Sequence, residues 1–190
     1  MPAEAQTFFE SLRLTGQTGS PATKASPPIK TDATQPTGKV PDGWVSFTPP
    51  SGNYSVAMPQ QPTETALKLP TGETKIFAVT LPNAAMPLHT TANPLPPELA
   101  KLSAEDMLRQ VALAVPLMSG GKVLEETKIS VGKHQGRQFH LTVQAKGGPI
   151  EVFARVYLVN DHIIVLQGPA TGSSPAQETA AFFNSLKIGG

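Results

Sequence analysis

Apolar and polar residues alternate with a period of two in short segments along most of the chain. The segments lie at 44–48, 53–58, 63–69, 74–81, 123–131, 137–145, 150–159 and 162–167. Such alternation is typical of β-strands, and glycine or proline residues separate neighbouring segments. Short hairpins should therefore join the strands, and the sheet should be largely antiparallel. The segment 150–159 is apolar on both sides, which predicts a central strand covered on both faces.

A helical spacing replaces the alternation after Ser103. The apolar stripe that follows consists of Met107, Leu108, Val111, Val115 and Met118. These residues recur at steps that place them on one face of a helix. We expect Ser103 to cap this helix by accepting a backbone N–H near Asp106. Pro116 and then Gly120-Gly121 are expected to end it.

A second helical pattern covers residues 175–187 and closes the chain. Ser174 is the expected N-cap. The glycine-rich segment 168–174 lacks the Lys-Ser/Thr pair of a phosphate-binding loop and is predicted to be a flexible connection. The order of four strands, a helix, four strands and a helix predicts an α+β fold. We expect a largely antiparallel sheet of about six to eight strands flanked by helices.

The two ends of the chain carry similar segments. Residues 3–16 read AEAQTFFESLRLTG, and residues 177–190 read QETAAFFNSLKIGG. Because the second segment contains the closing helix, we interpret residues 1–16 as an isolated helix, the remnant of a preceding repeat. Residues 17–41 are rich in proline, threonine and serine and are predicted to be a linker. Residues 42–190 are predicted to form the globular domain.

The apolar face of the first segment consists of Phe8, Phe9 and Leu12. A helix this short is marginally stable alone, so its apolar face should dock on another surface. An apolar groove of the same or a neighbouring molecule would give helix-swapped self-association. We therefore expect the partners to be neighbouring repeat domains of a multi-domain protein, or another protein.

Composition argues against several classes of partner. The net charge is +1 and 15% of the residues are charged, which disfavours nucleic acid and anionic membrane surfaces as partners. No apolar run reaches the length of a membrane span. The chain has no cysteine, which removes disulfides, thiolate nucleophiles and cysteine-bound metals. This composition is compatible with an oxidising compartment.

Candidate catalytic and metal-binding residues are few. The four histidines are His89, His134, His140 and His162. They show none of the HxH, HxxxH or HExxH spacings of zinc sites, and the chain has no GxSxG motif. We therefore expect no enzyme activity, no bound metal and no cofactor. The histidines are interpreted as solvated or hydrogen-bonded surface residues, with His140 on the polar side of its strand. A cluster of His140 with Asp161 or His162 stays open as the alternative. The pair Glu125-Glu126 is interpreted as strand surface.

The proline-rich segment 82–102 is predicted to be a long loop. A long loop within a compact domain is often functional. The candidate interaction surface on it consists of Met86, Leu88, His89, Leu95 and Leu99. Packing of these residues over the edge of the sheet is an equal alternative.

Several motifs together resemble a known family. They are GWVSF at 43–47, GNYSVAMP at 52–59, VGKHQGR at 131–137 and FFNSL at 182–186. This pattern resembles the PsbP/Mog-like superfamily of α/β/α sandwiches. Within that superfamily it is similar to uncharacterised bacterial domains of planctomycete type that begin F-x-x-x-x-G-x-Y/F-S-V-x-x-P.

The resemblance covers residues 43–188 and implies a non-catalytic module. Members of the superfamily dock onto larger assemblies such as the lumenal surface of photosystem II, bind a small GTPase, or occur as lipoproteins of the bacterial envelope. We therefore expect a non-enzymatic interaction or scaffolding module of a multi-domain bacterial protein, located outside the cytoplasm. The alternative is a small-ligand or metal-binding module that uses the sheet face near His140 and His162.

Overall fold

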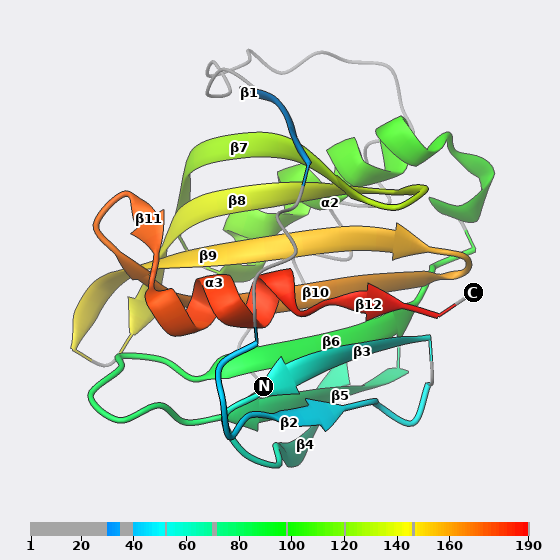
Figure 1. Cartoon of the computed structure of the whole chain (residues 1–190). Helices are drawn as coiled ribbons and strands as arrows, with labels where there is room; N and C mark the ends of the chain where they lie inside the picture. Colours follow the sequence, from blue (N-terminus) through cyan, green and yellow to red (C-terminus); the bar gives the residue numbers. More distant parts are fainter. Residues whose placement is uncertain are drawn as a thin grey trace.

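A long twisted sheet organises the domain (Figure 1). The computed structural model describes residues 30–34, 40–51, 53–69, 72–97, 99–119, 121–145 and 147–189. Within these residues the strand order is β1-β7-β8-β9-β10-β6-β5-β4, and β11 pairs with β10. The strands are β1 (Lys30–Thr34), β4 (Thr63–Leu69), β5 (Gly72–Val79), β6 (Leu88–Pro94), β7 (Lys122–Val131), β8 (His134–Ala145), β9 (Gly148–Val159), β10 (His162–Thr171) and β11 (Ser174–Pro175).

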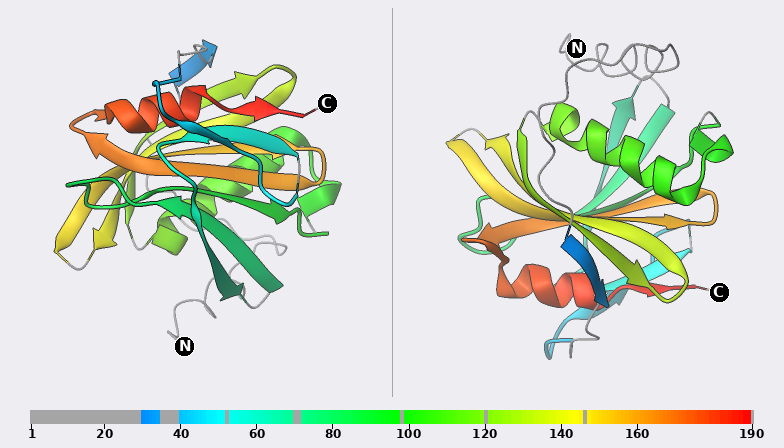
Figure 2. Two further views of the ribbon diagram at one scale, coloured as in Figure 1. Left: turned by 60° about the horizontal axis from the view of Figure 1, so that its bottom comes forward. Right: turned by 90° about the horizontal axis from the view of Figure 1, so that it is seen from above.

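The two faces of the sheet are covered differently, as the right-hand view of Figure 2 shows. Helix α2 (Ala104–Ser119) crosses one face. Helix α3 (Gln177–Asn184) and a small sheet cover the other face. The small sheet has the order β12-β3-β2 and consists of β12 (Lys187–Ile188), β3 (Tyr54–Met58) and β2 (Val45–Phe47). The predicted α+β fold, with a largely antiparallel sheet flanked by helices, is confirmed.

Strand β9 lies between two apolar cores. Its residues Val152 and Val156 belong to the core on the α2 side, while Phe153, Tyr157 and Val159 belong to the core on the α3 side. Alternate residues of a strand point to opposite faces, so a strand that is covered twice must be apolar at almost every position. The prediction of a doubly covered central strand at 150–159 is confirmed.

Helix α2 begins as the sequence predicts. The backbone N–H of Asp106 donates to Ser103 Oγ at 3.1 Å, and the Ser103 hydroxyl donates to the Asp106 carboxylate at 2.6 Å. This reciprocal pair satisfies one of the free N–H groups of the first turn. The helix continues through Pro116 and ends at Ser119, directly before Gly120.

Helix α3 closes the α3-side core. Phe182 and Phe183 are fully buried, and Leu186 is 5% exposed. Directly after the helix, Lys187 pairs with Ser55 and Ile188 with Tyr54 in the small sheet. The repeated FFxSL motif of the sequence is therefore, in its second copy, the part of the chain that holds the small sheet against the large one.

The glycine-rich segment before α3 has a different structure from the one predicted. Strand β10 runs on to Thr171, Gly172 turns with φ of 58°, and β11 pairs back onto the end of β10. The predicted flexible connection at 168–174 is therefore a hairpin. The N-cap of α3 is Ala176, without a side-chain hydrogen bond, so the prediction that Ser174 caps this helix is wrong.

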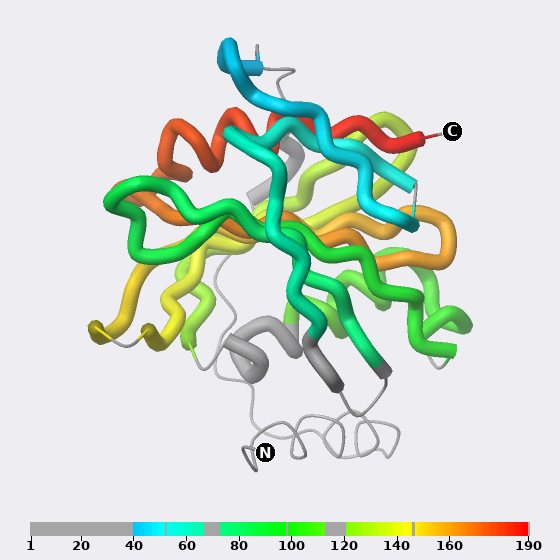
Figure 3. Tube along the Cα trace, turned by 90° about the horizontal axis from the view of Figure 1, so that it is seen from below, coloured from blue at the N-terminus to red at the C-terminus, as the bar shows by residue number. Residues whose placement is uncertain are grey.

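The segment predicted as a long loop at 82–102 contains strand β6, which lies between β5 and β10. Only residues 80–87 form the loop that joins β5 to β6 (Figure 3). The strand is polar but buried: Thr90 is fully buried, its hydroxyl donates to the carbonyl of Val165 at 3.0 Å, and the hydroxyl of Tyr54 lies 2.7 Å from it. The rest of the segment includes a short 3-10 helix at Leu99–Lys101.

Part of the predicted linker also belongs to the sheet. Residues 30–34 form β1, which pairs in parallel with β7 through Lys30 opposite Thr127 and Ala33 opposite Ile129. The linker prediction is therefore wrong for these five residues. The predicted helix at 1–16 and its face of Phe8, Phe9 and Leu12 lie outside the described residues. Among the described helices, none has the length and apolar character needed to cross a membrane.

Candidate binding cleft

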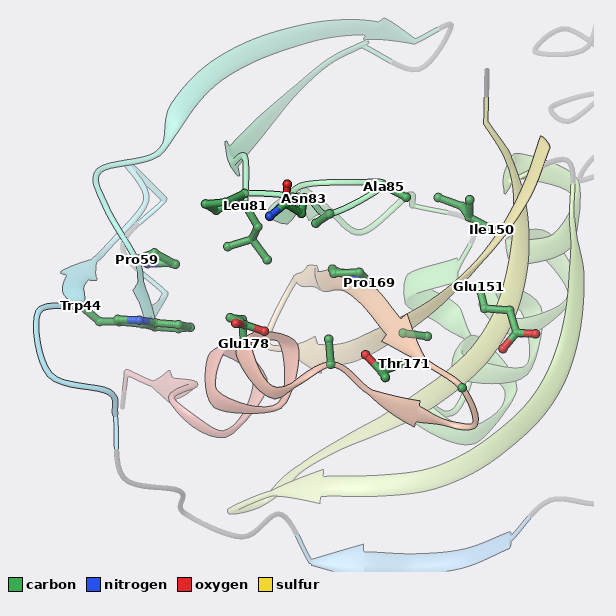
Figure 4. Close-up of a pocket in the computed structure, with 15 residues that line it drawn as sticks. Trp44, Pro59, Leu81, Asn83, Ala85, Ile150, Glu151, Pro169, Thr171 and Glu178 are labelled. Carbon is green, nitrogen blue, oxygen red and sulfur yellow. The ribbon is translucent and has the colours of Figure 1, made fainter. Parts of the chain in front are cut away.

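An open cleft of about 880 Å³ lies on the α3 side, beside the end of β10 (Figure 4). Six chain segments meet there, and most of the residues that line the cleft are alanines, prolines or other apolar residues. The lining consists of Trp44, Pro59, Leu81, Pro82, Asn83, Ala84, Ala85, Ile150, Glu151, Pro169, Ala170, Thr171, Gly172, Ala176 and Glu178. These residues are far apart in sequence, so the sheet register and the position of α3 create the cleft.

The backbone around the cleft is fixed by short-range hydrogen bonds. The carbonyl of Pro169 accepts the N–H of Ala176 at 3.1 Å and the Thr179 hydroxyl at 2.8 Å, which ties the first turn of α3 to β10. Opposite, Asn83 adopts a left-handed conformation with φ of 60°, which asparagine tolerates better than most residues. Leu81, before this turn, is 8% exposed and belongs to the α3-side core. Both walls are thus anchored to the core.

Close packing beneath the cleft requires a glycine. A Cβ atom at Gly168 would lie 2.6 Å from Thr179 Oγ1 and 2.7 Å from Leu88 Cδ2. A side chain here would therefore force Thr179 of α3 or Leu88 of β6 to shift. The absence of a side chain lets the helix approach the strand, and this approach sets the position of Glu178.

Trp44 forms one end of the cleft. It is half-buried, packs against the α3-side core and is the single tryptophan of the chain. Figure 4 shows its indole pointing along the cleft toward Glu178 on α3. Aromatic residues with one buried side and one accessible side are frequent anchors of binding sites. The indole is also a natural fluorescent reporter of anything that enters.

The charged groups of the cleft are carboxylates. Glu151 and Glu178 line it, while none of the lining residues is lysine or arginine. Figure 4 shows Glu178 at the Trp44 end and Glu151 at the opposite end. The cleft is therefore negative at both ends, although the chain as a whole carries a net charge of +1.

His140 on the neighbouring strand β8 contacts Glu151. Its Nε2 lies 2.9 Å from Glu151 Oε2, and its ring stacks on Phe153 with the centroids 4.5 Å apart. His140 is hydrogen-bonded, which is one of the two predicted states, but it is only 8% exposed, so its placement on the surface is wrong. The reason is that the face that carries His140 is covered on the α3 side, whereas the sequence pattern treated this face as solvated.

The histidine cluster that the sequence left open does not form. His140 lies opposite Phe153, which lies opposite Gly168, whereas His162 is six positions from Gly168 along β10. At about 3.3 Å per residue this separation is roughly 20 Å, too far for both side chains to bind one ligand. His162 contacts Asp161 at 2.6 Å and Asn53 at 3.1 Å instead. Over the described ranges, no three histidine, aspartate or glutamate residues are grouped as metal ligands.

The candidate surface of segment 82–102 is divided by the sheet. Leu88 is fully buried in the α3-side core, while Met86 packs against the core on the α2 side. His89 is half-buried, and burial lowers the pKa of its imidazole to about 4. Leu95 and Leu99 are half-buried beyond the far end of β6. Leu88 is therefore a core residue, and Met86 lies on the opposite face of the sheet from it.

The acidic pair at 125–126 is also more buried than predicted. Glu126 has a side chain 12% exposed, and its carboxylate lies 3.1 Å from Nε of the buried Arg137. Burial raises the pKa of Glu126, with Arg137 opposing the shift. Glu105 in the first turn of α2 lies 2.6 Å from Arg137 and 3.0 Å from Lys128. This network joins α2 to the sheet and is structural.

Comparison with known proteins identifies the fold. No family model and no curated protein matches the sequence. The solution structure of the cyanobacterial PsbP protein CyanoP from Synechocystis sp. PCC 6803 aligns with a TM-score of 0.51 and 12% identity, over 76% of this chain and 92% of CyanoP. A protein of unknown function from Pseudomonas aeruginosa, PA94, described as a putative regulator, aligns with a TM-score of 0.36 and 13% identity, over 65% of this chain and 80% of PA94.

The fold is thus PsbP-like, as the sequence motifs predicted. The cleft itself was not predicted. Asn83, Glu151 and Glu178 belong to no motif, and their proximity depends on the tertiary arrangement of loop, strand and helix. The one available signal was Trp44, a lone tryptophan within the motif of the opening strand.

Proposed function

We propose that the domain is a non-enzymatic interaction module that holds a segment of a partner protein in the cleft. The observation that carries this proposal is the cleft itself, with Trp44 at one end and walls of alanine and proline. Its volume of about 880 Å³ lies within the range of ligand-binding clefts. Small wall residues leave room for the side chains of an extended segment.

The groups in the cleft suit recognition better than catalysis. Its described lining offers two carboxylates, the Asn83 amide and the Thr171 hydroxyl, together with apolar surface. A few polar groups on an apolar surface orient a ligand. Nucleophilic catalysis instead requires a nucleophile within hydrogen-bond reach of a base. Glu151 already has a partner in His140.

The role of α3 supports the proposal that the module comes from a bacterial protein with tandem domains. The residues that bury α3 are Phe182, Phe183 and Leu186. Residues 3–16 carry the same residue types at the matching positions, including Phe8, Phe9 and Leu12. They therefore hold the side chains with which this fold closes a domain. We propose that this face docks on a neighbouring unit or on a second copy of the chain.

The cleft proposal can be tested with a library of random peptides displayed on phage and selected against the whole chain. Selected peptides should change the fluorescence of Trp44 and bind with a Kd that can be titrated. Ala85→Arg places a long side chain in the cleft, and Ala66→Arg places the same side chain on the exposed edge strand β4. Binding should fall by about tenfold or more in the first variant only, the loss expected when well-packed contacts are blocked.

The proposal would be overturned if no peptide is selected. It would equally be overturned if the selected peptides bind Ala85→Arg as tightly as the unaltered chain. Equal losses in both variants would show that the arginine acts through overall charge rather than by filling the cleft.

A further inference from the structure

We infer that the cleft selects a basic segment, and that a lysine or arginine side chain of the partner lies between Trp44 and Glu178. This inference rests on the proposed function and adds the chemistry of the partner. The cleft places carboxylates at both ends and apolar walls between them. Charge complementarity of this kind favours basic partners and disfavours acidic ones.

The Trp44 end has the geometry for a cation. Figure 4 shows the indole of Trp44, directly before β2, and the side chain of Glu178 on α3 next to each other at this end. A guanidinium or ammonium group that packs on the face of the indole at this end would also lie near a carboxylate. Cation–π attraction and a charged hydrogen bond would then act on the same group.

The opposite end places a second carboxylate in a defined position. His140 contacts Glu151 from strand β8 and its ring stacks on Phe153, so the carboxylate has a neighbour at 2.9 Å. Glu151 is still 47% exposed and available to a partner. The two ends therefore favour a segment with basic residues on either side of a short apolar stretch.

The apolar stretch matches the middle of the cleft. Ala85 and Pro169 line it between the two carboxylates. An extended segment directs successive side chains to opposite sides, so its alternate residues would contact these walls. A wholly polar basic segment, such as a nucleic-acid-binding tail, would leave this surface uncovered, and a nucleic acid would be repelled by the carboxylates.

The test uses the peptides selected from the random library. Lysine and arginine should be enriched in the selected peptides relative to the library. Replacing the basic residue of a selected peptide by glutamine should weaken binding by about tenfold, as expected for one cation–π contact and one charged hydrogen bond. Glu178→Gln should weaken binding of the basic peptide to a similar extent but not that of the glutamine peptide.

Glu151→Gln is the second variant, and Glu73→Gln on the exposed part of β5 is the control. Binding should weaken with rising salt in the unaltered chain and less so in the two cleft variants. This inference would be overturned if the selected peptides lack basic residues. It would also be overturned if the basic peptide binds equally to Glu178→Gln, Glu151→Gln and Glu73→Gln. Either result would leave the cleft proposal standing. The cleft proposal itself would be overturned if no peptide is selected or if the selected peptides bind Ala85→Arg as tightly as the unaltered chain.

Discussion

The backbone N–H of Ala57 donates a hydrogen bond of 2.8 Å to the hydroxyl of Ser185, although 128 positions separate the two residues. The same hydroxyl donates to the carbonyl of Phe182 at 2.6 Å, and both bonds are buried. One side chain thus links strand β3 of the small sheet to the last turn of α3. Because Ser185 satisfies two backbone groups that water cannot reach, it is a structural part of the FFxSL motif.

Ser185→Ala should therefore destabilise the domain. The substitution leaves the N–H of Ala57 without an acceptor in a buried place, which costs about 1–3 kcal/mol. Urea denaturation followed by circular dichroism measures the free energy of unfolding. Ser173→Ala, in the exposed turn before β11, is the matched control and should change it by less than about 0.5 kcal/mol. Equal effects of the two variants would contradict this role.

Arg155 predicts a second, larger loss of stability. It is 9% exposed, and its guanidinium lies 4.8 Å from the centre of the Phe183 ring. Its Nε donates to Gln138 at 2.8 Å, and a terminal nitrogen donates to Asn184 at 3.3 Å. Arg155→Met keeps an apolar stem but leaves the amide oxygens of Gln138 and Asn184 without this donor. We therefore expect the free energy of unfolding to fall by about 2–3 kcal/mol.

Arg109→Met on the exposed face of α2 is the control for Arg155→Met and should be nearly neutral. Both free energies come from the same urea titrations. A neutral Arg155→Met would show that the buried guanidinium is not required to hold α3 on the sheet.

The two serines expected to cap helices should behave differently. Ser103→Ala removes the acceptor for the N–H of Asp106 and should cost about 1 kcal/mol. Ser174→Ala should cost much less, because Ser174 lies in β11 and the N-cap of α3 is Ala176. Thermal melting of the two variants, measured side by side, compares the two losses of stability. A larger loss for Ser174→Ala would contradict the described start of α3.

His89 predicts a dependence of stability on pH. Burial lowers its pKa from 6.5 to about 4, so the folded chain keeps the imidazole neutral while the unfolded chain binds a proton. Above about pH 6.5 this pKa difference does not affect the free energy of unfolding. As the pH falls toward 4, proton binding by the unfolded chain lowers the free energy of unfolding, so stability is lost on acidification. The difference between the two pKa values corresponds to about 3 kcal/mol at most.

His89→Gln removes this titrating group and gives the comparison. Urea titrations at a series of pH values between 7 and 4 should show the unaltered chain losing more stability than His89→Gln over this range. A constant difference between the two chains at every pH would show that His89 is accessible to protons in the folded state.

The sequence pattern identified those strands whose buried residues are aliphatic or aromatic. It identified β9 because nearly every residue there is apolar, and it identified the cap of α2 because Ser103 and Asp106 are close in sequence. It missed β6, where the buried Thr90 is satisfied by hydrogen bonds to Tyr54 and Val165 from other strands. A polar strand of this kind is defined by its neighbours, not by its own periodicity.

The candidate site was hidden for a related reason. The cleft forms because the start of β9, the end of β10 and the first turn of α3 come together beside residues 81–85. No local spacing records this proximity. His140 shows the same limit, since its partner Glu151 lies on the next strand and its burial follows from the covering layer.

The most direct test of the central claim is a map of backbone amide chemical shifts recorded while a selected peptide is added to the chain labelled with nitrogen-15. The largest changes should fall on Trp44, on Leu81 and residues 83–85, at Ile150 and Glu151, on residues 170–172 and at Glu178. Changes concentrated on α2 or on the exposed edge of β4, with the cleft unaffected, would contradict this claim.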